Sequence, residues 1–308
     1  MATTTSITTT YAGEFAGKYI SAALLSGSTL ANDLITIKPN VKFKEVMKKV
    51  ATDDIVKNAS CDFDASSTLT LTERILQPEE FQVNLQLCKK DFISDWEAVS
   101  MGYSAYSDLP ANFSDFLIAH VSAKVAARIE NNIWGGTNAT AGQFDGFKTT
   151  LLADADVVDV GAGAAVTAAN VIDKMGLTVD GIPSTVYGAD DLVIYVAPNV
   201  YRAYVRALGG FSSQVGAAGT DSKGTQWFNG GALTFDGINV ALANGMASNT
   251  MVAAEKSNLF FGTGLLSDQN EVKVIDMADV DGSQNVRVVM RFTAGIQHAI
   301  GSDIVLYS

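Results

Sequence analysis

Cysteine and histidine are nearly absent from this chain of 308 residues. The two cysteines, Cys61 and Cys88, are too few for a disulfide framework, and their spacing fits no zinc site. We expect both to be free thiols in a reducing compartment, buried as small hydrophobic side chains. The two histidines, His120 and His298, lie in no catalytic motif, and we interpret both as structural contacts.

Charge is also scarce. Charged residues make up 18% of the chain, against about 25% in a usual globular protein. Hydrophobic residues make up 47%, so a disordered chain is excluded. So little charge leaves two interpretations open: the protein has an unusually large core, or it buries much of its surface against other subunits.

Long hydrophobic runs are missing too. The longest apolar stretches, residues 19–32 and 237–254, are too short or too often interrupted by asparagine to cross a bilayer. The N-terminus lacks the basic and apolar regions of a signal peptide. We therefore expect a soluble protein that is made in the cytoplasm and has no membrane partner.

The few charges are distributed unevenly. The net charge is −12, yet residues 1–50 carry six lysines and only three acidic residues. Because an acidic surface repels phosphate, sequence-specific binding of nucleic acid is not expected. The basic N-terminal region could dock on the acidic body of a neighbouring copy, or it could be an ordinary solvated surface. Charge alone leaves both interpretations open.

Catalytic motifs are lacking as well. Residues 161–166 begin like a dinucleotide loop but lack the third glycine and a preceding apolar strand. Asp154, Asp156 and Asp159 do not have calcium-loop spacing, and residues 279–282 are more simply a turn. We predict no catalytic, cofactor-binding or metal-binding residues and no cofactor.

The first ninety residues suggest an arm followed by β structure. Small residues dominate 1–35, which predicts an arm with at most a short helix near 14–25. Residues 69–75 and 81–88 alternate apolar and polar side chains, typical of half-buried strands. Such a long ribbon needs cover for its apolar face, within the chain or across an interface. Its tip lies near either residue 58 or residue 78.

A long helix is predicted over residues 111–134. Its apolar residues step by four, from Phe113 to Ile133, and two glycines end it. We place three charged residues on its polar side: Lys124, Arg128 and Glu130. A turn with two aromatic anchors follows, Phe144 and Phe147.

The second half alternates helices and strands, so the fold class is mixed α+β. In order, we expect a helix over 167–175 stopped by Gly176, a buried strand over 192–196, a helix over 198–208, a mobile loop over 209–231, a hairpin turn at Asp236-Gly237, and closing antiparallel strands over 285–292 and 298–307.

This order of parts is similar to that of the major capsid protein of tailed double-stranded DNA bacteriophages, with the Hong-Kong-ninety-seven-type capsid fold. Four local strings resemble capsid proteins of phages of Bacteroidetes-type hosts: residues 58–63, 71–74, 87–92 and 129–136. The resemblance implies five parts: an N-terminal arm (1–35), a β-ribbon extension loop (36–90, with 36 to about 78 lying over a neighbour), a peripheral domain with the spine helix (91–187), an axial domain (188–265) and strands returning to the peripheral domain (266–308).

The resemblance also implies a function. The chain would be a non-enzymatic virion protein that assembles with itself into hexamers and pentamers of an icosahedral head. That head would enclose double-stranded DNA without reading its sequence. Scaffold, portal and decoration proteins are further expected partners, and assembly is expected in the cytoplasm of the host bacterium. Two alternatives remain: an encapsulin-like compartment shell, and a cytosolic α+β enzyme with an unrecognised site.

Candidate interface residues follow from the same hypothesis. They are charged side chains that set the registry between subunits rather than the strength of their association. The set consists of Lys42, Lys44, Lys48 and Lys49, expected to face acidic neighbours, with Lys57, Glu73 and Arg74 on the ribbon.

Overall fold

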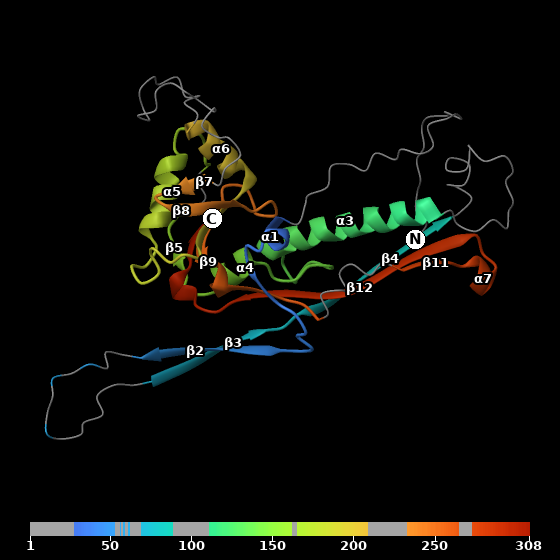
Figure 1. The fold of residues 1–308 in the computed structure, drawn as a ribbon, viewed down its shortest axis with the longest axis horizontal. Helices are drawn as coiled ribbons and strands as arrows, with labels where there is room; N and C mark the ends of the chain where they lie inside the picture. Colours follow the sequence, from blue (N-terminus) through green and yellow to red (C-terminus); the bar gives the residue numbers. More distant parts are fainter. Residues whose placement is uncertain are drawn as a thin grey trace.

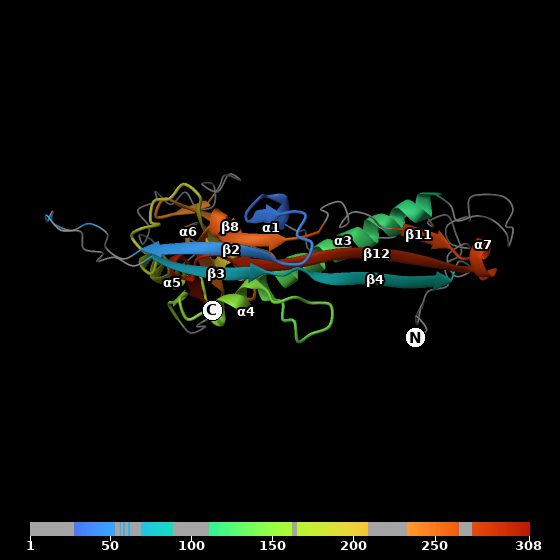
Figure 2. The same cartoon turned by 90° about the horizontal axis from the view of Figure 1, so that it is seen from below.

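The computed structural model describes residues 28–52, 56, 58, 61, 69–88, 111–161, 165–208, 233–264 and 273–308. These residues form an elongated, flat molecule with an α/β lobe, a long helix lying along an extended sheet, and a separate two-stranded ribbon (Figures 1 and 2). None of the helices in these ranges could span a membrane. The helix expected near 14–25 and the loop over 209–231 lie outside the described residues.

The long helix is α3, Ala111–Gly135, as the sequence predicts. Its apolar residues are buried at every fourth position from Leu117 through Val125 to Ile133, because a step of four keeps side chains on one helix face. Glu130 does not lie on the polar side as expected, since it is almost completely buried.

The extended sheet is built on β12, Asn285–His298. β4 (Glu79–Cys88) pairs antiparallel with most of its length, and β11 (Lys273–Asp276) pairs with its other edge. The end of β12 pairs with β10 (Leu259–Gly262), and β1 (Thr36–Lys38) adds to β10 in parallel. α3 lies along this sheet, and a short helix, α7 (Ala278–Asp281), links β11 to β12.

The alternation predicted for β4 is confirmed by its pairing. One face of β4 joins the buried face of β12, with these opposed pairs: Phe81 and Phe292, Val83 and Met290, Leu85 and Val288, Leu87 and Val286. The side chains of β12 on that face are buried from Val286 to Met290.

The α/β lobe contains a six-stranded sheet in the order β5-β13-β9-β6-β8-β7. The strands are β5 (Val158–Asp159), β13 (Val305–Tyr307), β9 (Met251–Glu255), β6 (Leu192–Val196), β8 (Ile238–Leu242) and β7 (Leu233–Phe235). β6 is buried throughout, as predicted. The turn between β7 and β8 has positive φ at both Asp236 and Gly237, which confirms the predicted hairpin.

Among the described residues, two α-helices belong to the lobe, α5 (Val171–Asp180) and α6 (Pro198–Leu208). α6 has the predicted bounds. α5 does not: it begins after Asn170 rather than Thr167 and continues through Gly176 to Asp180. Three of its last five residues are buried or half-buried, so packing holds the helix together across a residue of low helix propensity.

The last strand is shorter than expected. β12 continues to His298, and β13 covers only residues 305–307, where it pairs antiparallel with β9 and parallel with β5 inside the lobe. A short turn over Gly301–Asp303 carries the chain from one sheet to the other.

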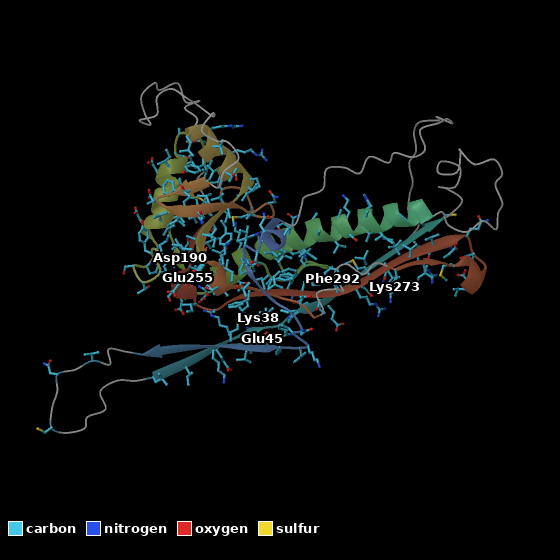
Figure 3. All side chains as sticks on the ribbon, viewed as in Figure 1. Lys38, Glu45, Asp190, Glu255, Lys273 and Phe292 are labelled. Atoms are coloured by element: carbon cyan, nitrogen blue, oxygen red, sulfur yellow. The ribbon has the colours of Figure 1, made fainter. Side chains whose placement is uncertain are left out.

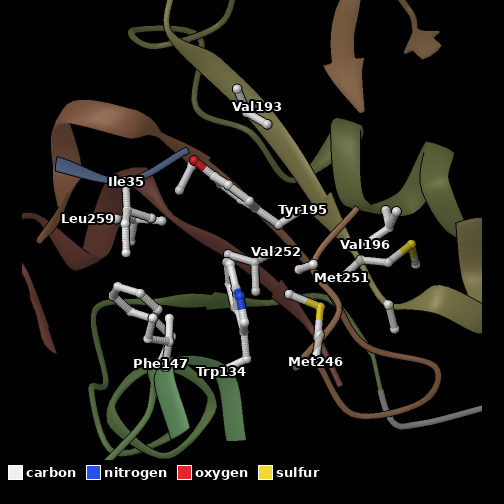
Figure 4. Packing of buried hydrophobic residues seen from close by; sticks show 14 of the residues in the cluster. Ile35, Trp134, Phe147, Val193, Tyr195, Val196, Met246, Met251, Val252 and Leu259 are labelled. Carbon is white, nitrogen blue, oxygen red and sulfur yellow. The ribbon is translucent and has the colours of Figure 1, made fainter. Parts of the chain in front are cut away.

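The hydrophobic core joins these parts (Figure 4). Trp134 at the end of α3 packs in tilted geometry against Phe147 of α4 (Phe147–Leu152) at 5.4 Å and against Tyr195 of β6 at 5.1 Å, centroid to centroid. Phe144 and Phe147 are both buried, which confirms the two predicted anchors. At Gly146 a Cβ atom would lie 2.4 Å from the carbonyl oxygen of Asn132, so this turn requires glycine.

The ribbon consists of β2 (Glu45–Thr52) and β3 (Leu69–Leu76), which pair with each other and form a sheet of their own. It projects away from the rest of the molecule (Figure 1). Because β3 pairs back on β2, the connection at the free end lies between residues 52 and 69. Of the two predicted positions for the tip, the one near residue 58 is therefore confirmed.

Candidate subunit interface

One face of the ribbon is apolar and exposed. Val46 lies opposite Ile75, and Leu69 and Leu71 lie on the same face because side chains two apart point the same way. All four side chains are exposed, Leu69 by 63% and Leu71 by 62%. We call this surface the apolar ribbon face. No described part of the chain covers it, so it is available to another molecule.

Charged residues stand within the apolar ribbon face. Lys48 lies directly opposite Glu73, between the two apolar ends. Both residues are exposed, as are Lys42 and Lys44 before the ribbon. Opposite charges at facing positions favour this strand register and leave little net charge on the face. Phe43, exposed by 71%, adds a further large apolar group just before β2, near the root of the ribbon.

The ribbon is fixed to the body at its root. Leu76, the last residue of β3, is fully buried and packs on Gly262, where a Cβ atom would lie 2.9 Å from its Cδ2 atom. Gln297 of β12 donates a hydrogen bond to the carbonyl oxygen of Ile75 at 3.1 Å. Lys38 and Glu45 form an ion pair at 2.5 Å beside this point (Figure 3).

A shared carboxylate also holds the root. Arg74 and His298 both donate to the Oδ2 atom of Asp154, His298 through Nε2 at 2.7 Å. The Oδ1 atom of Asp154 accepts the backbone N–H of Asp156 at 3.1 Å. The side chain of His298 is fully buried, and its Nδ1 atom has no hydrogen-bond partner among the described residues. The geometry fits a neutral imidazole that donates from Nε2.

The pKa values at this point follow from burial and hydrogen bonding. Burial raises the pKa of Asp154, but the hydrogen bonds from His298 and Asp156 and the charge of Arg74 outweigh it, so the net pKa lies below its ordinary value. Burial lowers the pKa of His298, which the bond to Asp154 only partly opposes. At neutral pH the cluster is therefore a carboxylate, a guanidinium and a neutral imidazole.

The start of the described chain is anchored by the buried Glu130. Its carboxylate accepts the backbone N–H of Thr29 at 3.1 Å and the hydroxyl of Thr29 at 2.5 Å. The indole N–H of Trp134 donates to the same hydroxyl at 2.8 Å. Residues 28–35, which the sequence places in the arm, therefore include a segment packed on α3, with α1 (Ser28–Ala31) at its beginning.

Acidic residues gather at the end of the lobe nearest the ribbon. Burial and the charges of Asp191 and Asp303 raise the pKa of Glu255. Figure 3 shows Asp190 and Glu255 at this end. Among the described residues there is no group of three or more histidine, cysteine or acidic side chains arranged to hold a metal ion.

The predicted interface residues fall into three groups. Lys42, Lys44, Lys48 and Glu73 are exposed at the ribbon or its approach. Arg74 is paired with Asp154 of its own chain, so its guanidinium is already engaged. Lys57 and the side chain of Lys49 lie outside what the structure describes. Whether the exposed charges contact a neighbour stays a prediction.

The predicted set of interface residues contained only charged residues, although the sequence also indicated an apolar ribbon face that needs cover. The alternation of Leu69 and Leu71 with threonines was a sufficient signal, since it predicts an apolar face that needs cover. The cysteines also differ from expectation: both are free, but Cys61 is exposed and Cys88 is only half-buried.

Comparisons with known proteins locate the fold. No family model and no curated protein matches the sequence. Among solved structures, a chain of Mycobacterium phage Che8 is 11% identical, with a TM-score of 0.56, and the match covers 98% of both chains.

Two further solved structures are similar. A chain from the capsid of the native GTA particle is 13% identical, with a TM-score of 0.61 over 94% of this chain and 92% of that one. The capsid of Myoviridae Phage XM1 gives 11% identity and a TM-score of 0.60 over 94% of both chains. The chain therefore has the fold of phage capsid proteins, which confirms the predicted α+β capsid fold.

Proposed function

We propose that this chain is a structural virion protein whose copies assemble into hexamers and pentamers of an icosahedral phage head. The observation that carries the proposal is the combination of a capsid fold over nearly the whole chain with an exposed apolar ribbon face. Apolar side chains that the monomer leaves in water favour association, because burial removes them from solvent.

The ribbon supplies the contact in this proposal. It projects past its own body and would lie over an adjacent copy, with Leu69 and Leu71 buried in the contact and the Lys48–Glu73 pair setting the register. The packaged genome is double-stranded DNA, held without base-specific contacts, as suits an acidic chain. The protein is then a component of the virion that is assembled in the host cytoplasm, with scaffold, portal and decoration proteins as further partners.

The test compares assembly of three full-length chains, alone and together with the scaffold, portal and decoration proteins proposed as partners. Wild type should form rings and closed shells, visible by negative-stain microscopy and light scattering. The Leu69→Ser/Leu71→Ser variant should stay a small species with unchanged circular dichroism. Leu152→Ser replaces a leucine of similar exposure on α4 and should assemble normally.

Two outcomes would contradict the proposal. One is a wild type that remains monomeric under every condition. The other is a ribbon variant that assembles as well as wild type. Shells that form without enclosing DNA in infected cells would instead indicate an encapsulin-like compartment.

A further inference from the structure

The outer face of α5 is unusual for a surface helix of a small lobe. Ile172, Asp173, Leu177 and Asp180 all lie on it, and Ile172 and Leu177 are exposed by 48% and 44%. Gly176 lies between them, with open space where a Cβ atom would be. The face therefore combines two large apolar groups, two carboxylates and a position where another chain can approach the backbone closely.

The carboxylates of this face are not neutralised by the lobe itself. Within the described ranges, neither Asp173 nor Asp180 has an ion pair. The nearest lysine in sequence, Lys174, points elsewhere: its ammonium group lies 5.9 Å from the ring centre of Tyr307. The outer face of α5 is thus acidic as well as apolar.

The outer face of α6 has the opposite charge. Arg202 and Arg206 are one turn apart, both are exposed, and neither forms an ion pair with any described residue. Two like charges four residues apart on a helix destabilise it slightly unless something pairs with them. The half-buried Val205 lies beside them. This face is therefore suited to an acidic partner with some apolar surface.

The two faces belong to one lobe but are at different sides of it. α5 and α6 touch each other, and Figure 1 shows α5 at the left side of the lobe and α6 at its upper right side. A ring of identical subunits needs two different, complementary patches on each subunit, because each contact is head-to-tail. The acidic face of α5 and the basic face of α6 meet this requirement.

We propose that in each ring of copies the outer face of α5 docks on the outer face of α6 of the next copy. Asp173 and Asp180 then pair with Arg202 and Arg206, while Ile172 and Leu177 are buried around Gly176. The inference rests on the proposed function, since it assigns the contact that closes hexamers and pentamers. The partner is a second copy of this chain.

The test uses two charge-reversed full-length chains. Asp173→Arg/Asp180→Arg makes both faces basic, and Arg202→Glu/Arg206→Glu makes both acidic. Each chain alone should need a protein concentration more than about tenfold higher to assemble, because like charges oppose one another in every contact. The four substitutions combined in one chain should restore assembly.

A mixture of the two double variants gives the sharpest result. The contacts are attractive only between unlike chains, so the two must alternate around a ring. An alternating ring closes with six members but not with five. Negative-stain microscopy and native mass spectrometry of the mixture should therefore show hexamers without pentamers.

The matched control is Lys124→Glu/Arg128→Glu, which reverses an exposed basic pair of the same spacing on α3. It should assemble like wild type, and circular dichroism melting should show all variants folded. Normal assembly of either double variant alone, or pentamers from the mixture, would overturn the α5–α6 contact but leave the shell proposal intact. Failure of wild type itself would overturn the shell proposal.

Discussion

The molecule contains two long antiparallel strand pairs that differ in what covers them. In β12 the apolar face is buried from Val286 to Met290, and three of the four apolar side chains opposite it on β4 pack against that core, whereas Leu85 is 45% exposed. In β2 and β3 the apolar ribbon face remains exposed, with no described element over it. Both pairs have the same alternating pattern, so the pattern alone predicts an apolar face and not its partner. Folding covers most of the first apolar face, and the described part of the chain leaves the second uncovered.

The largest expected effect comes from the covered pair. Met290 of β12 is 1% exposed, and Met290→Ala should lower the free energy of unfolding by about 2–5 kcal/mol, because it removes buried methylene groups and leaves a cavity. Urea denaturation of the monomer measures this. Leu71→Ala on the ribbon is the counterpart and should change the free energy of unfolding by less than about 0.5 kcal/mol. An equal decrease in the free energy of unfolding for the two variants would show that burial does not distinguish the two strand pairs.

The hydrogen bonds from Thr29 to Glu130 should also stabilise the covered part of the molecule. Glu130→Ala leaves the N–H and hydroxyl of Thr29 without their acceptor in a buried place. The free energy of unfolding should fall by about 1–3 kcal/mol. Thermal melting followed by circular dichroism is a suitable measurement, with Asn131→Ala, an exposed neighbour on α3, as the control. A melting temperature equal to that of wild type would show that the anchor is dispensable.

Acid should weaken the contacts at the root, where the ribbon is fixed to the body of the molecule. His298 has a pKa below its ordinary 6.5 in the folded state, so as the pH falls below 6.5 the unfolded chain binds a proton that the folded chain does not. Stability should therefore fall with pH by at most about 1.4 kcal/mol per pH unit.

His298→Gln should flatten that slope between about pH 7 and pH 5.5, measured by urea denaturation at each pH. The lowered pKa of Asp154 acts at lower pH: its contribution is present above 3.8 and is lost as the pH falls through its folded value. An unchanged slope in His298→Gln would rule out this imidazole as the titrating group.

The smallest effect is expected at the surface of the root. Glu45→Gln breaks the ion pair with Lys38, whose side chains are both partly exposed. Solvent screens such pairs, so the free energy of unfolding should change by about 0–1 kcal/mol and less at high salt. Urea denaturation at low and high salt measures it. A loss above 2 kcal/mol would show that the root depends on this pair rather than on Leu76 and Arg74.

The helices, strands and turns that the sequence predicted correctly are those with strong signals in their own residues. α3, α6 and β6 have strong periodicity or clear end residues, and the β7–β8 turn has an Asp-Gly pair, so each was predicted where it lies. α5 was misplaced for the same reason: Thr167 and Gly176 resemble helix ends, but tertiary packing determines the bounds.

Contacts between distant residues were beyond the sequence. No residue near Glu130 in the sequence indicates that Thr29 donates hydrogen bonds to it. The sequence therefore predicts a solvent-exposed position for Glu130. Likewise Arg74 has no local sign of pairing with Asp154. The charged residues proposed for the candidate site therefore stay a prediction, and only the structure shows that Arg74 is already engaged within the chain.

The position of β12 near the end of the chain determines when β4 can pair with it during synthesis. β4 ends at residue 88, yet its partner strand begins at residue 285, so the apolar side of β4 stays unpaired until nearly the whole chain has left the ribosome. His298, which helps fix the root of the ribbon, emerges later still. A truncated translation product that ends before β12 therefore lacks Gln297 and His298, two of the residues that fix the root of the ribbon.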